Sequence, residues 1–272
     1  MVEIWHRIWV PSSPGLLLGL CREVIYQVVY NDSMQETTFD KEREITSGGR
    51  FLVVGVDEAG RGPLAGPVVA AAVCYRDPSY TIPDSLTRDF ALIRDSKKLS
   101  EKQREKIFDL IQEYFYVGVG IVHADTIDRI NILEATFLAM KSAIASLKQQ
   151  LTKNNQRVRD EELYVLIDGN QEIPNLSLKQ ETVVGGDGTV RSIAAASIIA
   201  KVTRDRIILV YDKEYPQYGL AQHKGYGTQV HMDALRKYGP SPIHRMSFKP
   251  VLLSIPENAN RRFSNDLKRR KG

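Results

Sequence analysis

The chain has 272 residues, of which 43% are hydrophobic and 26% are charged. This composition predicts a soluble globular protein with one large domain or two small ones. Two cysteines exclude a disulfide framework and a cysteine metal site, and no apolar run is long enough for a transmembrane helix. Because no convincing export signal is present, we expect a cytoplasmic protein that does not bind membranes.

The formal net charge of +4 is unevenly distributed, because residues 261–272 hold six basic side chains against one acid, Asp266. We therefore separate a basic tail, residues 256–272, from the rest of the chain. Such a tail often attracts phosphate backbones, and a solvated chain end explains it equally well.

Residues 1–49 are predicted to be an appended segment and linker. Both tryptophans and a charge-rich span, residues 31–50, set this segment apart from the remainder of the chain. The sequence leaves open whether the segment folds. We expect no chemistry from it, and we expect activity to survive its removal. The functional domain is predicted to span residues 50–255.

This domain begins with an apolar run, residues 51–56, that predicts a strand covered on both faces, and residues 68–74 are predicted to be its partner strand. The first run ends in Asp57 and Glu58. Neighbouring side chains of a strand point to opposite faces, so both carboxylates can serve one site only if the strand stops there. The glycine-rich turn after Glu58 allows it to stop.

Asp57 and Glu58 predict a divalent metal site. Two carboxylates at the end of a buried strand repel each other and lose hydration unless a cation compensates. The alternative is an acidic pair in an ordinary surface turn. The adjacent sequence Gly60-Arg61-Gly62 favours the metal site, because glycines let the main chain approach a ligand closely.

Further along the chain, periodicity and capping signals predict alternating helices and strands. They are a helix that starts at Ser100, a strand over 116–122, a long helix over 130–151, strands over 163–167 and 181–184, and helices over 190–215 and 230–238. This order favours a three-layer α/β domain.

Three of the predicted strands end in an acid next to glycine: Asp57, Asp168 and Asp187. Strand ends gather along one edge of a sheet with parallel neighbours, where such folds place their sites. One acid at a strand end is usually a turn residue or a helix cap, but three together indicate a shared site. Asp205 is a further candidate acid, although its flanking arginines favour an ion pair.

The loop 221–228 combines Lys224, a histidine and Tyr226 between glycines, which suits binding of a nucleotide sugar or phosphate. The chain has no P-loop, and no G-x-G-x-x-G follows the first strand. A carboxylate cluster without a nucleophile–histidine pair suits phosphodiester hydrolysis with two hard cations. The residues alone thus predict a metal-dependent nuclease or phosphatase.

Five segments resemble, in the same order, the motifs of bacterial type 2 ribonuclease H, ribonuclease HII. The resemblance spans about residues 51–252 and implies a ribonuclease H-like three-layer α/β fold. In that fold a mixed five-stranded sheet is flanked by helices and followed by a C-terminal helical extension. The segments are residues 57–67 (DEAGRGPLAGP), 95–99 (DSKKL), 168–170 (DGN), 192–205 (SIAAASIIAKVTRD) and 223–228 (HKGYGT).

The resemblance also implies a four-carboxylate catalytic site. Asp57, Glu58, Asp168 and Asp187 match the metal-binding acids of the family, and Mg²⁺ or Mn²⁺ is the implied cofactor. Gly185 replaces a lysine that is usual in the family, which leaves Asp205 as an alternative to Asp187.

A second group of residues matches the part of the family's site that grips the nucleotide 5′ of the cut and senses its 2′-hydroxyl. These residues are Gly60, Arg61, Gly62 and Tyr226, and Lys97 and Lys224 are expected to bind substrate as well. The 2′-hydroxyl is what distinguishes RNA from DNA at one nucleotide. The arginine at position 61 argues against the sister type 3 enzymes, which lack it.

The implied activity is cleavage of the RNA strand of RNA–DNA hybrids and incision 5′ of single ribonucleotides in duplex DNA, which leaves a 5′-phosphate and a 3′-hydroxyl. We expect the protein to act as a monomer on these substrates. Two alternatives remain open from the sequence. One is a structure-selective DNA nuclease of related fold, and the other is a catalytically silent module that binds hybrids.

Overall fold

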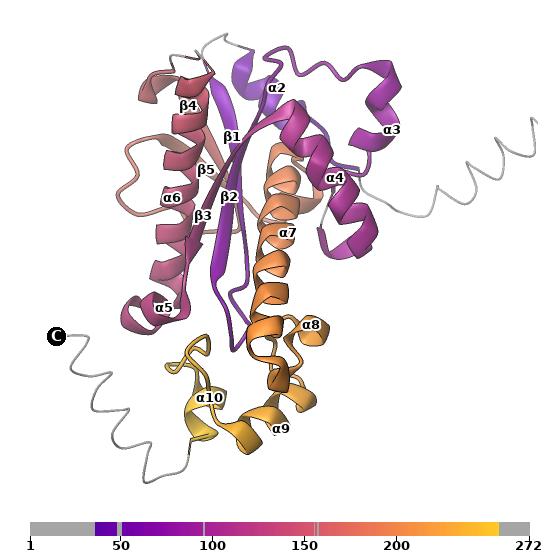
Figure 1. Cartoon of the computed structure of the whole chain (residues 1–272). Coiled ribbons are helices and arrows are strands. Elements are labelled where there is room, and N and C mark those ends of the chain that lie inside the picture. Colours follow the sequence, from indigo (N-terminus) through magenta and orange to yellow (C-terminus); the bar gives the residue numbers. More distant parts are fainter. Residues whose placement is uncertain (1–35, 48–50, 95, 155, 157, 256–272) are drawn as a thin grey trace, which may run out of the picture. The chain divides into compact units, whose positions relative to one another are not determined.

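The computed structural model describes residues 36–47, 51–94, 96–154, 156 and 158–255 (Figure 1). These residues belong to one compact unit that begins at Glu36. The first 35 residues, Asp95 and the predicted basic tail 256–272 lie outside the described residues.

A mixed five-stranded sheet forms the centre of this unit, with the strand order β3-β2-β1-β4-β5. The strands β1, β2 and β3 pair antiparallel, whereas β4 runs parallel to both β1 and β5. The three-layer α/β fold predicted from the sequence is confirmed. The strands are β1 (Leu52–Ala59), β2 (Val68–Tyr75), β3 (Phe115–Val122), β4 (Leu163–Asp168) and β5 (Lys179–Val183).

Long helices cover the two faces of the sheet (Figure 1). Helix α6 packs on one face, and α7 packs on the other face with α4 beside it. Shorter helices gather around the C-terminal end of α7 and form the helical extension. The helices are α2 (Asp40–Thr46), α3 (Thr87–Phe90), α4 (Glu101–Tyr114), α5 (Ala124–Ile130), α6 (Ile132–Lys153), α7 (Arg191–Glu214), α8 (Leu220–His223), α9 (Gln229–Tyr238) and α10 (Lys249–Leu253).

The alternation of side chains along β1 decides which face each carboxylate points to. Val54 and Val56 pack into the core on the α6 side, whereas Val53 belongs to the core on the α7 side. Gly55 lets α7 approach, because a Cβ atom there would lie 2.2 Å from the carbonyl carbon of Ser192. The same alternation places Asp57 on the α7 face.

The prediction that the first strand stops at its two acids is wrong. Strand β1 continues to Ala59 and stays paired with β2 as far as the Ala59–Val69 pair. Because the neighbouring strand holds it in register, Asp57 and Glu58 keep the opposite orientations of a regular strand. The turn comes at Gly60, whose φ of 98° is open mainly to glycine.

The predicted long helix over 130–151 starts later than expected. Asn131 has a φ of 70° and separates α5 from α6, and its side chain accepts hydrogen bonds from the backbone N–H groups at the start of α6. The predicted helix start at Ser100 is confirmed, because Ser100 and Gln103 form a reciprocal capping box.

The segment 36–46 packs into the domain, so the compact unit begins before the boundary expected at residue 49. Phe39 is fully buried, and its ring stacks on Tyr75 with the centroids 4.8 Å apart. Glu42 is also buried, and its carboxylate accepts a 2.9 Å hydrogen bond from the backbone N–H of Ser192 at the start of α7. Two residues of this charge-rich span, Phe39 and Glu42, are therefore part of the buried interior.

Among the helices of the described residues, none combines the length and apolarity needed to span a membrane.

Candidate active site

Three carboxylates converge where the parallel strands end. Asp57 comes from β1, Asp168 is the last residue of β4, and Asp187 lies in the short turn after β5. One oxygen from each of the three lies within 4.8 Å of the others. The parallel pairing of β1, β4 and β5 brings these residues together from positions far apart in the chain.

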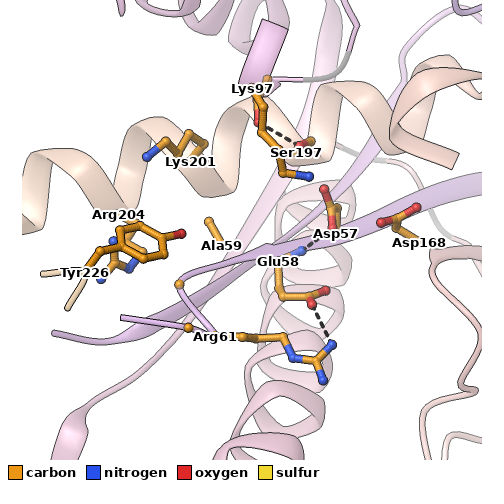
Figure 2. A pocket seen from close by; sticks show the side chains of 13 residues that line it. Asp57, Glu58, Ala59, Arg61, Lys97, Asp168, Ser197, Lys201, Arg204 and Tyr226 are labelled. Atoms are coloured by element: carbon orange, nitrogen blue, oxygen red, sulfur yellow. Dashed lines mark hydrogen bonds and ion pairs between the residues drawn. The ribbon is translucent and has the colours of Figure 1, made fainter. Parts of the chain in front are cut away.

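Glu58 borders the same cavity from the other side of β1. Figure 2 shows Asp57 beside Asp168, while Glu58 turns toward Arg61. The distance between Glu58 Oε1 and Arg61 Nη1 is 3.2 Å. Glu58 is therefore adjacent to the three converging carboxylates without being one of them, because regular strand geometry turns its side chain away from Asp57.

The carboxylates of Asp57, Glu58, Asp168 and Asp187 form what we call the acidic edge, where burial and mutual repulsion disfavour the charged forms. Burial, followed by the charges of Glu58 and Asp168, raises the pKa of Asp57 well above its ordinary value. The pKa of Glu58 is also raised by burial, although Arg61 opposes the shift. Burial and the charge of Asp187 raise the pKa of Asp168. Carboxylates in this condition are stabilised when cations bind beside them.

The donor set fits a hard divalent cation. The converging ligand atoms are all carboxylate oxygens, which Mg²⁺ and Mn²⁺ prefer over the softer donors of zinc sites. The ammonium of Lys97 reaches Asp187 at 3.4 Å, but its side chain is 79% exposed and compensates little of the charge.

The cavity beside the acids measures about 330 Å³. It is bordered by Asp57, Glu58 and Asp168, and by most of the residues that the sequence predicts to contact substrate. Lys224 is not among its lining residues; its carbonyl instead accepts a hydrogen bond from Arg204 inside the domain. The predicted substrate-contacting residues that line the cavity are Gly60, Arg61, Gly62, Lys97 and Tyr226.

Five lining residues were not predicted as site residues: Ala59, Ser96, Ser197, Lys201 and Arg204. The hydroxyl groups of Ser96 and Ser197 lie 3.0 Å apart, and Ser197 also offsets part of the pKa rise of Asp57 through a hydrogen bond. Ser197 is a polar residue within the otherwise apolar, buried run 193–200 of α7. That contrast is a signal in the sequence that could have identified it.

Asp205 lies apart from the converging acids. Its carboxylate pairs with Lys201 at 2.8 Å, one turn earlier on α7. The expected ion pair is present, but its partner is a lysine rather than a flanking arginine. Among the described residues, Asp187 and not Asp205 shares the oxygen cluster with Asp57 and Asp168.

Two buried arginines hold the turn that carries Gly60, Arg61 and Gly62. Arg245 donates hydrogen bonds to the carbonyls of Gly60, Arg61 and Gly66 at 2.6–3.0 Å. Arg204 donates three more, to the carbonyls of Ala65, Pro67 and Lys224. Each guanidinium thereby uses its donors on main-chain oxygens, which fixes the turn and the loop before Tyr226 in one arrangement.

Comparison with known proteins agrees with this geometry. The family model described as Ribonuclease HII matches residues 54–251. The chain belongs to the ribonuclease HII family. A ribonuclease HII of Endomicrobium trichonymphae is 48% identical over 221 residues, which cover 80% of this chain and 95% of that protein. The chain is therefore a hydrolase and an endonuclease of the ribonuclease H type.

Solved structures share the fold. The ribonuclease H2 of Pyrococcus horikoshii OT3 is 27% identical, covers 77% of this chain and 98% of its own, and has a TM-score of 0.55. Bst-RNase HIII in complex with Mn²⁺ is 16% identical, covers 75% of this chain and 69% of its own, and has a TM-score of 0.57. The likeness to the second structure concerns the fold alone.

Proposed function

We propose that this ribonuclease HII hydrolyses the RNA strand of RNA–DNA hybrids and incises duplex DNA on the 5′ side of a single embedded ribonucleotide. The single observation that carries the proposal is that Arg61 and Tyr226 border the same cavity as Asp57 and Asp168. Side chains that can recognise a ribose thus border the same cavity as carboxylates that can bind the metal needed for hydrolysis.

Recognition of the 2′-hydroxyl would come from the Gly60–Gly62 turn together with Tyr226. A Cβ atom at Gly62 would lie 3.5 Å from the Tyr226 ring, so glycine leaves open the space between turn and ring. Tyr226 is 47% exposed, which leaves its hydroxyl accessible to a ligand. A deoxyribose would leave these polar groups without a partner, and that loss is the physical basis of discrimination.

Asp57, Glu58, Asp168 and Asp187 would hold the divalent cations, with Mg²⁺ or Mn²⁺ as the cofactor. When bound, two such ions supply an activated water and neutralise charge on the leaving oxygen. Ribonucleases H depend on divalent metal, and the related fold of Bst-RNase HIII is solved with Mn²⁺. The acids fix where the scissile phosphate sits relative to the ribose-reading turn.

The basic side chains at the cavity would orient the nucleic acid. Arg61 is half exposed and Lys97 is mostly exposed, so both can contact phosphates from the solvent side of their ion pairs with Glu58 and Asp187. We expect Lys224 to contact the backbone further from the cut, since it does not line the cavity. We also propose that one chain is sufficient for activity.

The test is cleavage of a DNA duplex with one ribonucleotide, in Mg²⁺ and separately in Mn²⁺. We expect a single nick 5′ of the ribonucleotide with 5′-phosphate and 3′-hydroxyl ends, and no cutting of the matched all-DNA duplex. An intact ribonucleotide-containing duplex under both metals contradicts the proposal. Cleavage of branched all-DNA substrates would instead favour a structure-selective DNA nuclease.

A further inference from the structure

Three histidines lie beneath the loop that carries Tyr226. His231 and His244 are almost completely buried, at 0% and 1% exposure, and their Nε2 atoms are 3.0 Å apart. The ring of His223 stacks on His231 with the centroids 4.5 Å apart. None of these side chains is among the lining residues of the cavity, so any influence on the reaction is indirect, and the loop is the segment that His231 contacts.

The hydrogen bonds assign one tautomer to each member of the buried pair. The carbonyl of Tyr226 can only accept, so the Nδ1–H of His231 donates to it at 2.9 Å. His231 Nε2 must then accept, and His244 donates to it through its own Nε2–H. His244 Nδ1 is left as an acceptor for the backbone N–H of Ser241 at 3.0 Å.

This series of hydrogen bonds requires the rings of His231 and His244 to be neutral, because protonation of either ring would place two N–H donors against each other at one of the contacts. Burial, followed by the neighbouring His231, lowers the pKa of His244 to about 4. Burial also lowers the pKa of His231. The environment therefore favours the neutral forms that the hydrogen bonds demand.

The chain of hydrogen bonds ends at the residue proposed to read the ribose. The amide of Tyr226 also bonds to the carbonyl of His223, and the adjacent Gly225 carbonyl accepts from Leu64 in the turn region. We propose that His231, held in one tautomer by His244 and Ser241, is a positioning residue that fixes Tyr226 opposite Gly62. This inference rests on the proposed role of Tyr226.

Two substitutions of His231 separate its two hydrogen bonds. The amide nitrogen of asparagine can occupy the place of Nδ1 and keep the bond to the Tyr226 carbonyl, whereas glutamine reaches the place of Nε2 and keeps only the contact with His244. On an RNA–DNA hybrid, we expect kcat/KM to fall about tenfold in His231→Gln and by less than about threefold in His231→Asn, since one hydrogen bond separates the two variants. Thermal unfolding of both variants measures any general loss of stability.

The decisive measurement is a double-mutant cycle with Tyr226→Ala. If His231 acts through Tyr226, His231→Gln has no further effect on kcat/KM once the ring is absent, so the two losses are not additive. Additive losses, or equal losses in His231→Gln and His231→Asn, overturn the inference. The cycle is measured on the hybrid substrate. Its outcome for His231 is therefore independent of whether the protein incises at single ribonucleotides, and the two proposals can fail separately.

Discussion

The acidic edge and the turn that carries Gly60, Arg61 and Gly62 lie side by side at one cavity, but opposite interactions build them. At the acidic edge, carboxylates of like charge are buried together, and burial raises the pKa of Asp57 and of Asp168. At the turn, Arg245 and Arg204 donate six hydrogen bonds to backbone carbonyls. The fold itself supplies the hydrogen-bond donors of the turn, whereas the acidic edge keeps like charges that a bound cation would compensate.

This difference predicts opposite responses to substitution. Neutralising an acid should remove activity while relieving repulsion in the metal-free protein. Removing a guanidinium should leave buried carbonyls without donors and weaken the fold itself, because an unsatisfied buried polar group costs free energy.

The largest effect is expected for Asp168→Asn. The substitution keeps the shape of the side chain but removes a charge from the oxygen cluster, so divalent metal should bind weakly. We expect cleavage of an RNA–DNA hybrid in Mg²⁺ to fall by about a thousandfold or more, as loss of several kcal/mol of transition-state stabilisation implies. Circular dichroism should show an unchanged fold.

Asp205→Asn is the matched control, because Asp205 pairs with Lys201 outside the oxygen cluster. Its cleavage rate should change by less than about tenfold, as expected when one ion pair is lost. Equal losses in the two variants would argue against the assignment of the metal site to Asp57, Asp168 and Asp187.

The next effect concerns the turn. Arg245→Met should lower the free energy of unfolding by about 3–5 kcal/mol, because it removes the donor of three carbonyl groups, those of Gly60, Arg61 and Gly66, of which the first and last are buried. Denaturant unfolding with and without Mg²⁺ measures it, and the loss should be the same in both conditions. Arg236→Met on α9 is the control, since Arg236 is exposed and its ion pair within the described residues is with Asp233 at the surface.

A smaller effect is expected at the start of α7. Glu42→Ala removes the buried carboxylate that accepts from Ser192, and we expect a loss of about 1–2 kcal/mol of unfolding free energy, typical of a lost helix cap. Glu44→Ala on the same helix changes an exposed side chain and should alter stability by no more than about 0.5 kcal/mol. Identical values for the two variants would show that segment 36–46 does not support α7.

The sequence predicts the acidic edge better than it predicts the turn. Apolar runs that end in an acid and a glycine identify Asp57 and Asp168 in the sequence, and the parallel pairing of β1 with β4 brings the two residues together. Arg245 carries no such signal, because it lies 185 positions from Gly60 in the chain and its role depends on tertiary packing. The same holds for Glu42, 150 positions from Ser192.

Local reasoning also misplaces two backbone features. The glycines after Glu58 predict that the strand stops at its acids, but pairing with β2 extends it to Ala59. Periodicity predicts a continuous helix over 130–151, but Asn131 interrupts it with a positive φ. In the first case pairing with the neighbouring strand outweighs the glycines, and in the second case the Asn131 cap outweighs the helical periodicity.

The acidic edge also predicts a pH dependence with a definite sign. The pKa of Asp57 is raised above its ordinary value of 3.8 in the folded state, so its contribution to stability is present below that pH and is lost as the pH rises through the folded-state pKa. Without metal, the wild-type protein should therefore become less stable relative to Asp57→Asn as the pH rises from about 4 toward neutrality.

The most direct test is thermal unfolding of the wild type and Asp57→Asn at neutral pH, with a chelator and with excess Mg²⁺. Without metal, Asp57→Asn should unfold about 2–4 °C above the wild type, as relief of about 1 kcal/mol implies for a chain of this size. Mg²⁺ should raise the wild-type midpoint and leave that of the variant nearly unchanged. If Asp57→Asn is the less stable protein in the chelator and both midpoints respond equally to Mg²⁺, the acidic edge is not a site that a cation completes.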